Sequence, residues 1–173
     1  MHFLKSEGII INRLTLRDAD KLLTIFTPDY GKLVCYARGV HNIRSSRLTK
    51  LNIFSRIKFE LVVKGNHKVL THVDLLSSYR HNKTNLVHIQ RMFQIGELIN
   101  ELTPEEQAQP EIYDLLETAL THLSRFSTPE YLYRFKLKLL HLLGYGRNDL
   151  QPQTIDAYIE SILEHPLRTP TIF

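Results

Sequence analysis

Seven basic side chains and no acidic one lie in a thirty-residue stretch of the sequence, from Tyr30 to Phe59. The bases are Lys32, Arg38, Arg44, Arg47, Lys50, Arg56 and Lys58. Cations at this density neutralise phosphates, and aromatic rings among them stack on the bases of a single strand. A surface that serves only solubility normally mixes the two signs of charge. The stretch therefore predicts binding of a polyanion, the alternative being a solvated surface whose lysines protect strand edges.

This stretch belongs to a basic half of the chain. Residues 1–80 hold 14 Lys and Arg against 6 Asp and Glu, a net charge of +8. Residues 81–173 hold 8 against 12, a net charge of −4, which leaves +4 for the whole chain. We expect a polyanion to contact the first half, because the second half would repel it. The alternative is two solvated surfaces whose charges differ without consequence.

The first half carries the pattern of a small β-barrel. Short apolar or alternating segments predict five strands, at residues 8–16, 22–27, 33–38, 53–64 and 68–79. Turn residues separate them at Pro28–Gly31 and at Gly65-Asn66. Five strands in about 75 residues, with a long connection between the third and the fourth, suit a closed or nearly closed barrel.

The second half has the period of amphipathic helices. Apolar residues three and four apart, with helix-start and helix-stop signals, predict helices at residues 86–102, 110–126, 129–143 and 153–165. Thr103-Pro104-Glu105-Glu106 and Thr128-Pro129-Glu130 are interpreted as helix starts, and Gly144 as a helix stop. The chain is therefore predicted to be α+β, with a barrel domain at residues 1–80 and a helical domain at residues 81–173.

Signatures of enzymes are absent from the sequence. It contains no phosphate-binding glycine loop and no HExxH, CxxC or GxSxG motif. The single cysteine, Cys35, alternates with core positions, so we expect a buried thiol. We therefore predict no catalytic site, no metal, no cofactor and no small-molecule substrate. No apolar run approaches the ~18 residues of a membrane span, and we expect a cytoplasmic protein without a membrane partner.

Strand alternation gives the basic stretch a geometry. On the third strand it places Leu33, Cys35 and Ala37 in the core, and on the fourth it adds Ile53, Ile57 and Phe59. The outward side chains are then Lys32, Val34, Tyr36 and Arg38 on the third strand and Phe54, Arg56 and Lys58 on the fourth. The connection at residues 39–52 adds Arg44, Arg47 and Lys50. In five-stranded barrels of this kind, strands two and three with their flanking loops form the usual binding surface.

Several short segments, in this order and spacing, resemble the amino-terminal domain of RecO, the bacterial recombination mediator. They are Glu7-Gly8-Ile9-Ile10, residues 20–27, Gly31-Lys32, Ala37-Arg38-Gly39, Ser46-Arg47-Leu48, Leu51 and Phe54. The match covers about the first 80 residues. Leu142-Leu143-Gly144-Tyr145 resembles a recurring segment of the family's helical domain.

The resemblance implies an OB-fold barrel followed by a helical domain. It also implies binding to single- and double-stranded DNA, annealing of complementary strands, contact with the single-strand-binding protein SSB, and cooperation with RecR in loading RecA. The resemblance further implies a bacterial protein that lies in the cytoplasm, associated with the nucleoid. Two departures set this chain apart: it lacks the four zinc-site cysteines of many members, and only about 28 residues follow Tyr145.

Two sets of residues are the candidates for contacts. Lys32, Arg38, Arg44, Arg47, Lys50, Arg56 and Lys58 are expected to contact DNA phosphates, with Tyr36 as a stacking platform. Arg125, Arg134, Lys136 and Lys138 are candidates for the acidic SSB tail or, alternatively, solvated helix faces. Two other functions fit the same residues: an adaptor that binds an acidic protein segment, and an RNA-binding barrel.

Overall fold

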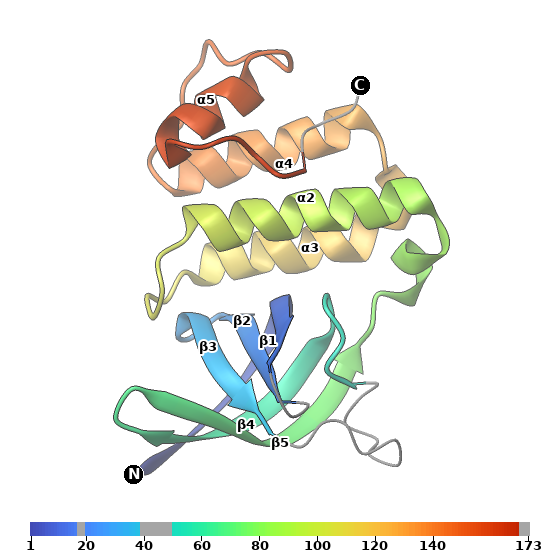
Figure 1. The fold of residues 1–173 in the computed structure, drawn as a ribbon. Helices are drawn as coiled ribbons and strands as arrows, with labels where there is room; N and C mark the ends of the chain where they lie inside the picture. Colours follow the sequence, from blue (N-terminus) through green and yellow to red (C-terminus); the bar gives the residue numbers. More distant parts are fainter. Residues whose placement is uncertain (17–19, 39–49, 170–173) are drawn as a thin grey trace. The chain divides into compact units, whose positions relative to one another are not determined.

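The computed structural model describes residues 1–16, 20–38 and 50–169. The chain divides into two compact units (Figure 1). The barrel unit is Met1–Tyr79 together with Pro104–Tyr113, and the helical unit is Arg80–Thr103 together with Asp114–Phe173. The segment Pro104–Tyr113 therefore packs with the barrel, although it lies far from the barrel strands in the sequence. The boundary between two domains at residue 80 stays a prediction.

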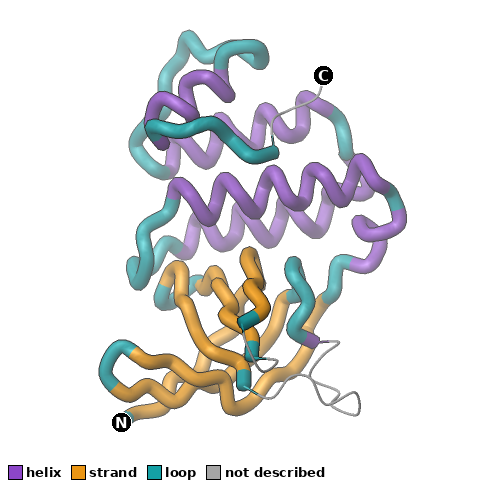
Figure 2. Tube along the Cα trace, in the orientation of Figure 1, coloured by secondary structure: helices purple, strands orange, loops and turns teal. Residues whose placement is uncertain are grey.

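Five strands form a closed barrel in the first unit. They are β1 (His2–Thr15), β2 (Lys21–Thr27), β3 (Gly31–Ala37), β4 (Arg56–Lys64) and β5 (His67–Ser77). Their order around the barrel is β1-β2-β3-β5-β4, and every pairing is antiparallel except that of β3 with β5. Figure 2 shows these strands in orange. The predicted α+β class with a five-stranded OB-type barrel is confirmed.

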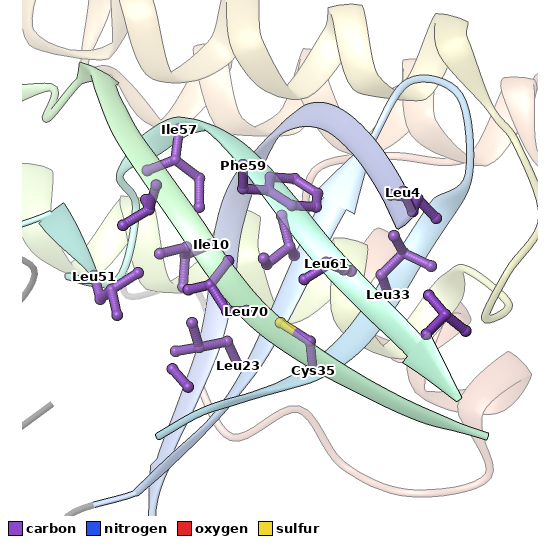
Figure 3. Packing of buried hydrophobic residues seen from close by; sticks show 14 residues of the cluster. Leu4, Ile10, Leu23, Leu33, Cys35, Leu51, Ile57, Phe59, Leu61 and Leu70 are labelled. Carbon is purple, nitrogen blue, oxygen red and sulfur yellow. The ribbon is translucent and has the colours of Figure 1, made fainter. Parts of the chain in front are cut away.

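The barrel interior is filled by apolar side chains from all five strands. The cluster is Leu4, Ile10, Leu23, Ile25, Leu33, Cys35, Ala37, Leu51, Ile57, Phe59, Leu61, Val63, Leu70 and Val73 (Figure 3). Cys35 points into this cluster as predicted, and burial raises the pKa of its thiol from the ordinary 9.0 to about 12. The thiol therefore stays protonated at neutral pH, as an inert core residue. Ile53, predicted as core, is only half-buried.

Four α-helices and one short 3₁₀ helix follow the barrel strands. They are η2 (Arg80–Thr84), α2 (Leu86–Leu102), α3 (Pro110–Phe126), α4 (Pro129–Leu142) and α5 (Ile155–Leu163). Local caps set two of the starts: the side chains of Asn85 and Thr128 accept hydrogen bonds from the backbone N–H groups of Val87 and Tyr131. After α4, Gly144 takes the left-handed conformation with φ +83°. The predicted helices agree to within a few residues.

The interpretation of Thr103-Pro104-Glu105-Glu106 as a helix start is wrong. Thr103 is the C-cap of α2 instead, because its backbone is extended with φ −101° and ψ 140°. Its N–H and its hydroxyl both donate to the carbonyl of Ile99. The next six residues, Pro104–Gln109, are not helical and lie against β3; we call them the strap. Glu105 forms a parallel bridge with Lys32, and the N–H of Glu106 donates to the Lys32 carbonyl at 3.0 Å.

Two absences can be stated for the part of the chain that the structure describes. In residues 1–16, 20–38 and 50–169, no helix has the length and apolar character needed to cross a membrane. Within the same ranges, no three His, Cys, Asp or Glu side chains gather closely enough to hold a metal ion.

Candidate nucleic-acid interface

The strand order separates the predicted bases into two groups. Because β5 lies between β3 and β4, the outward side chains of β3 and β4 do not form one surface. Strand alternation predicts which side chains point outward, but it does not predict which strands are neighbours. Arg44 and Arg47 lie outside the described residues.

On the first of these surfaces, the outer side of β2 and β3, an apolar row is centred on Tyr36. Tyr36 pairs with Leu22 of β2, and Leu22 pairs in turn with Leu14 of β1. On its other side Tyr36 pairs with Val69 of β5. The half-buried ring of Tyr36 lies 6.4 Å from the ring of His67, centroid to centroid. Two rings and several apolar groups are thus available at the surface for contact with flat bases.

A hollow of about 750 Å³ opens beside this ring pair. We call it the Tyr36 hollow. It lies entirely within the barrel unit and is lined by His2, Leu4, Leu22, Tyr30, Leu33, Val34, Tyr36, Val63, Gly65, Asn66, His67, Lys68, Glu105 and Glu106. Its walls come from β1 to β5, the turn between β2 and β3, the turn between β4 and β5, and the strap. In OB-folds, the face of strands two and three and the loop between strands four and five bind oligonucleotides and oligosaccharides.

His67 and Lys68 line the candidate site but are not among the residues predicted from the sequence. Residue 68 is predicted only as the start of the fifth strand, and His67 has no predicted role. A signal was present, because both follow the turn pair Gly65-Asn66 between strands four and five, and an OB-fold carries that turn to its binding face. The Lys68 ammonium forms an ion pair with the carboxylate of Glu106 on the strap.

The expectation that Lys32 is an outward base is wrong. The residue is only 9% exposed, and its backbone is paired with the strap through Glu105 and Glu106. Gly31, next to it, has φ +66°, and a Cβ there would lie 1.9 Å from the Gln107 carbonyl oxygen. The strap therefore approaches β3 as closely as a glycine permits, and it covers a base that alternation alone leaves outside.

Arg38 and Lys50 flank the connection that holds Arg44 and Arg47. Arg38 is exposed at the end of β3 and lines a small depression with residues 70–73 of β5. Lys50 donates a hydrogen bond to the carbonyl of Val73 at 3.1 Å, and its ammonium lies 3.6 Å from the Asp74 carboxylate. Both ends of the connection therefore lie along β5, and of these two bases Lys50 already has an acidic neighbour.

The bases of β4 lie on a surface of mixed charge. Arg56 Nη2 is 3.1 Å from Glu7 Oε1, and the hydroxyl of Tyr113 donates to the same carboxylate oxygen at 3.3 Å. Burial, with the nearby charge of Glu7, raises the pKa of Tyr113 and keeps it protonated as this donor. Lys58 is exposed, but its register partners are the acids Glu7 on β1 and Asp74 on β5. The acid-free stretch in the sequence thus meets acids from two neighbouring strands.

Further pairs continue this mixed surface. Lys5 Nζ lies 2.6 Å from Glu60 Oε1, and His72 Nε2 lies 3.0 Å from Asp74 Oδ2. The hydrogen bonds with Lys5 and with His72 are the largest causes that hold the pKa values of Glu60 and Asp74 below their ordinary values. Both carboxylates are therefore ionised at neutral pH. We call this group, which is Lys5, Glu7, Arg56, Lys58, Glu60, His72 and Asp74, the mixed-charge surface, and its acids make it a poor surface for a polyanion.

Phe54 is not the outward ring that alternation predicts. Its side chain is only 2% exposed, its backbone has φ 58°, and β4 begins only at Arg56. The Phe54 N–H donates to the carbonyl of Ile10 at 2.7 Å. This left-handed residue breaks the extended backbone, so the alternation counted from residue 53 does not hold at its beginning.

The helical candidates for a partner contact differ in exposure. Lys136 is buried, and its ammonium forms an ion pair with Asp156, so it is neither a surface contact nor a solvated residue. Arg134 is exposed and hydrogen-bonded to Glu130 at 2.9 Å, whereas Arg125 lies over the ring of Phe126 at 5.4 Å. Lys138 is exposed. A partner role for Arg125, Arg134 and Lys138 stays a prediction.

Comparison with known families finds two matches that together cover most of the chain. The family model described as "Recombination protein O N terminal" matches residues 1–90, and "Recombination protein O C terminal" matches residues 92–148. The chain belongs to the recombination protein O family. This confirms the resemblance found in the sequence, and the two RecO matches follow each other along the chain as the barrel strands and the helices do.

Curated relatives carry the same family name. The DNA repair protein RecO of Symbiobacterium thermophilum is 34% identical over 142 residues, which are 80% of this chain and 56% of the relative. The DNA repair protein RecO of Geobacter sulfurreducens is 30% identical over 146 residues, 84% of this chain and 60% of the relative. This RecO-family chain thus spans between 56% and 60% of the length of these two relatives.

Proposed function

We propose that the chain binds single-stranded DNA on the β2–β3 face of its barrel. The observation that carries the proposal is the ring pair of Tyr36 and His67 beside a hollow that Lys68 also lines. Arg38 adds an exposed cation at the end of the same strand as Tyr36. Aromatic rings stack on bases of any sequence while cations follow the phosphates, and each stacked base contributes about 1–3 kcal/mol.

The proposal extends to a role in DNA repair through strand annealing. Membership in the RecO family supports it, since the relatives are DNA repair proteins by name. A surface that neutralises phosphates on two strands lowers their mutual repulsion, and base pairing then supplies the free energy of annealing. No catalytic group is needed for this step. By family resemblance, the proposal includes binding of double-stranded DNA, contact with SSB, and cooperation with RecR in loading RecA in the bacterial cytoplasm.

A second candidate, binding of an acidic protein segment, is favoured by one observation. The strap is itself such a segment, and its Glu106 is ion-paired with Lys68, both of which line the Tyr36 hollow. A partner with similar acidic residues could use the same cation. The two candidates differ in whether aromatic stacking contributes, because a peptide without rings gains nothing from Tyr36 and His67.

A fluorescence titration of the full chain with labelled oligo(dT), and with an acidic peptide of equal charge, distinguishes the two candidates. With about four phosphates contacted, by Arg38, Lys68, Arg44 and Arg47, the logarithm of the DNA association constant should fall with the logarithm of salt concentration with a slope of about −3. Arg38→Gln should make this slope shallower by about 0.7. Lys58→Gln, on the mixed-charge surface, is the matched control and should leave it unchanged. A slope near zero, or tighter binding of the peptide than of DNA, would contradict the proposal.

A further inference from the structure

We propose that Glu106 of the strap occupies, in the DNA-free protein, the position of a DNA phosphate at Lys68. When a DNA strand binds, its phosphate replaces the Glu106 carboxylate as the partner of Lys68. This inference rests on the proposed function, and it makes the strap an internal competitor that sets how tightly the β2–β3 face holds DNA.

The exposure of the two partners suits such an exchange. The Lys68 side chain is only 13% exposed, whereas that of Glu106 is 58% exposed. The ammonium is therefore held in the barrel surface, and its partner carboxylate approaches from the solvent side. A phosphate would approach from the same side, because both groups line the open Tyr36 hollow. The cation can thus stay in place while the anion is replaced.

The backbone of the strap is fixed independently of this side chain. The Glu106 N–H donates to the Lys32 carbonyl at 3.0 Å, and Glu105 bridges to Lys32. Gln107 packs directly against Gly31, where a Cβ would lie 1.9 Å from its carbonyl oxygen. Release of Lys68 therefore requires only rotation of the Glu106 side chain, and the carboxylate remains tethered near the site. A tethered anion competes at a high effective concentration.

Two measurable consequences follow for the binding of a DNA strand. First, Glu106→Gln should tighten oligo(dT) binding about three- to fivefold, because the phosphate no longer has to replace a partly exposed ion pair. Second, salt also screens the Lys68–Glu106 ion pair that the DNA strand has to replace in the wild type. The affinity of Glu106→Gln for oligo(dT) should therefore fall more steeply with salt than that of the wild type.

Glu111→Gln is the matched control. It removes the same charge from an exposed residue of the same unit that does not line the Tyr36 hollow, so oligo(dT) affinity should change less than about twofold. A double-mutant cycle adds a second readout: Lys68→Gln should weaken binding, and adding Glu106→Gln to it should give no further tightening. All variants are compared as the full chain, after thermal unfolding shows that they are folded.

The outcomes separate the inference from the proposed function. Equal tightening by Glu111→Gln and Glu106→Gln would show a long-range charge effect and overturn the exchange. Tightening by Glu106→Gln that persists without Lys68 would also overturn it. No tightening by Glu106→Gln while the wild type binds oligo(dT) would overturn it as well. If the wild type fails to bind oligo(dT) at any salt concentration, the proposed function itself is wrong, and the exchange with it.

Discussion

Replacing Tyr36 with alanine is expected to weaken the binding of single-stranded DNA by about 1–3 kcal/mol, a factor of about 5 to 150. The ring lies on the outer side of β3, paired in register with Leu22 and beside His67, so it is placed for a base to stack on it. Fluorescence anisotropy of labelled oligo(dT) measures the dissociation constant. The effect should be the same for different base sequences, because stacking is tolerant of sequence.

Two control variants identify stacking as the cause. Tyr36→Phe keeps the ring and should bind within about twofold of the wild type, since stacking does not require the hydroxyl. Phe3→Ala removes a ring that is 63% exposed on β1, where its register partner is Val62 of β4. It should leave DNA binding unchanged. Equal losses for Phe3→Ala and Tyr36→Ala, or none for Tyr36→Ala, would contradict stacking on this face.

Replacing Asp156 with alanine should lower the free energy of unfolding of the helical unit by about 3 kcal/mol. Lys136 is 4% exposed at its side chain and Asp156 is 23% exposed, so the mutation leaves a buried ammonium without this partner. Removal of one member of a buried ion pair typically costs 3–5 kcal/mol, and the partial exposure of Asp156 places the effect at the lower end. Urea unfolding followed by circular dichroism measures it.

A second ion pair of the same unit provides the comparison. Glu130→Ala breaks the exposed pair with Arg134, one helical turn away, and should cost less than about 0.5 kcal/mol. Combining Lys136→Met with Asp156→Leu should recover most of the stability lost in Asp156→Ala, because apolar side chains of similar volume often replace a buried pair at no cost. If Asp156→Ala and Glu130→Ala lower the free energy of unfolding by similar amounts, the burial of Lys136 does not add to the strength of its ion pair.

Local sequence patterns predicted the fold well because their causes are local. The α2 helix runs over Leu86–Leu102 as predicted, since its apolar spacing and its Asn85 cap act within a few residues. The buried side chains of β3, such as those of Leu33 and Cys35, are likewise predicted by alternation along a single strand. The predicted start of the fourth strand was wrong because one residue departs from the extended backbone. Phe54 has φ 58°, and β4 begins only at Arg56.

The candidate site was predicted less well because it depends on contacts between distant segments. The burial of Lys32 comes from a strap more than seventy residues later, and a helix-start interpretation of that strap hid the contact. The acids that neighbour Arg56 and Lys58 come from β1 and β5, through register that a single strand does not reveal. A count of charges along one stretch therefore overstated the basic surface, whereas Tyr36 and Arg38 kept their predicted positions at the surface.

The most direct measurement is a map of the backbone amide signals of the isotope-labelled full chain during titration with oligo(dT). If the β2–β3 face binds the DNA strand, the signals of Tyr36, His67 and Lys68 shift with a common dissociation constant, while those of Lys58 and Glu60 of β4, which do not line the Tyr36 hollow, stay in place. Shifts centred on Lys58 and Glu60, with Tyr36 unaffected, would contradict binding on the β2–β3 face.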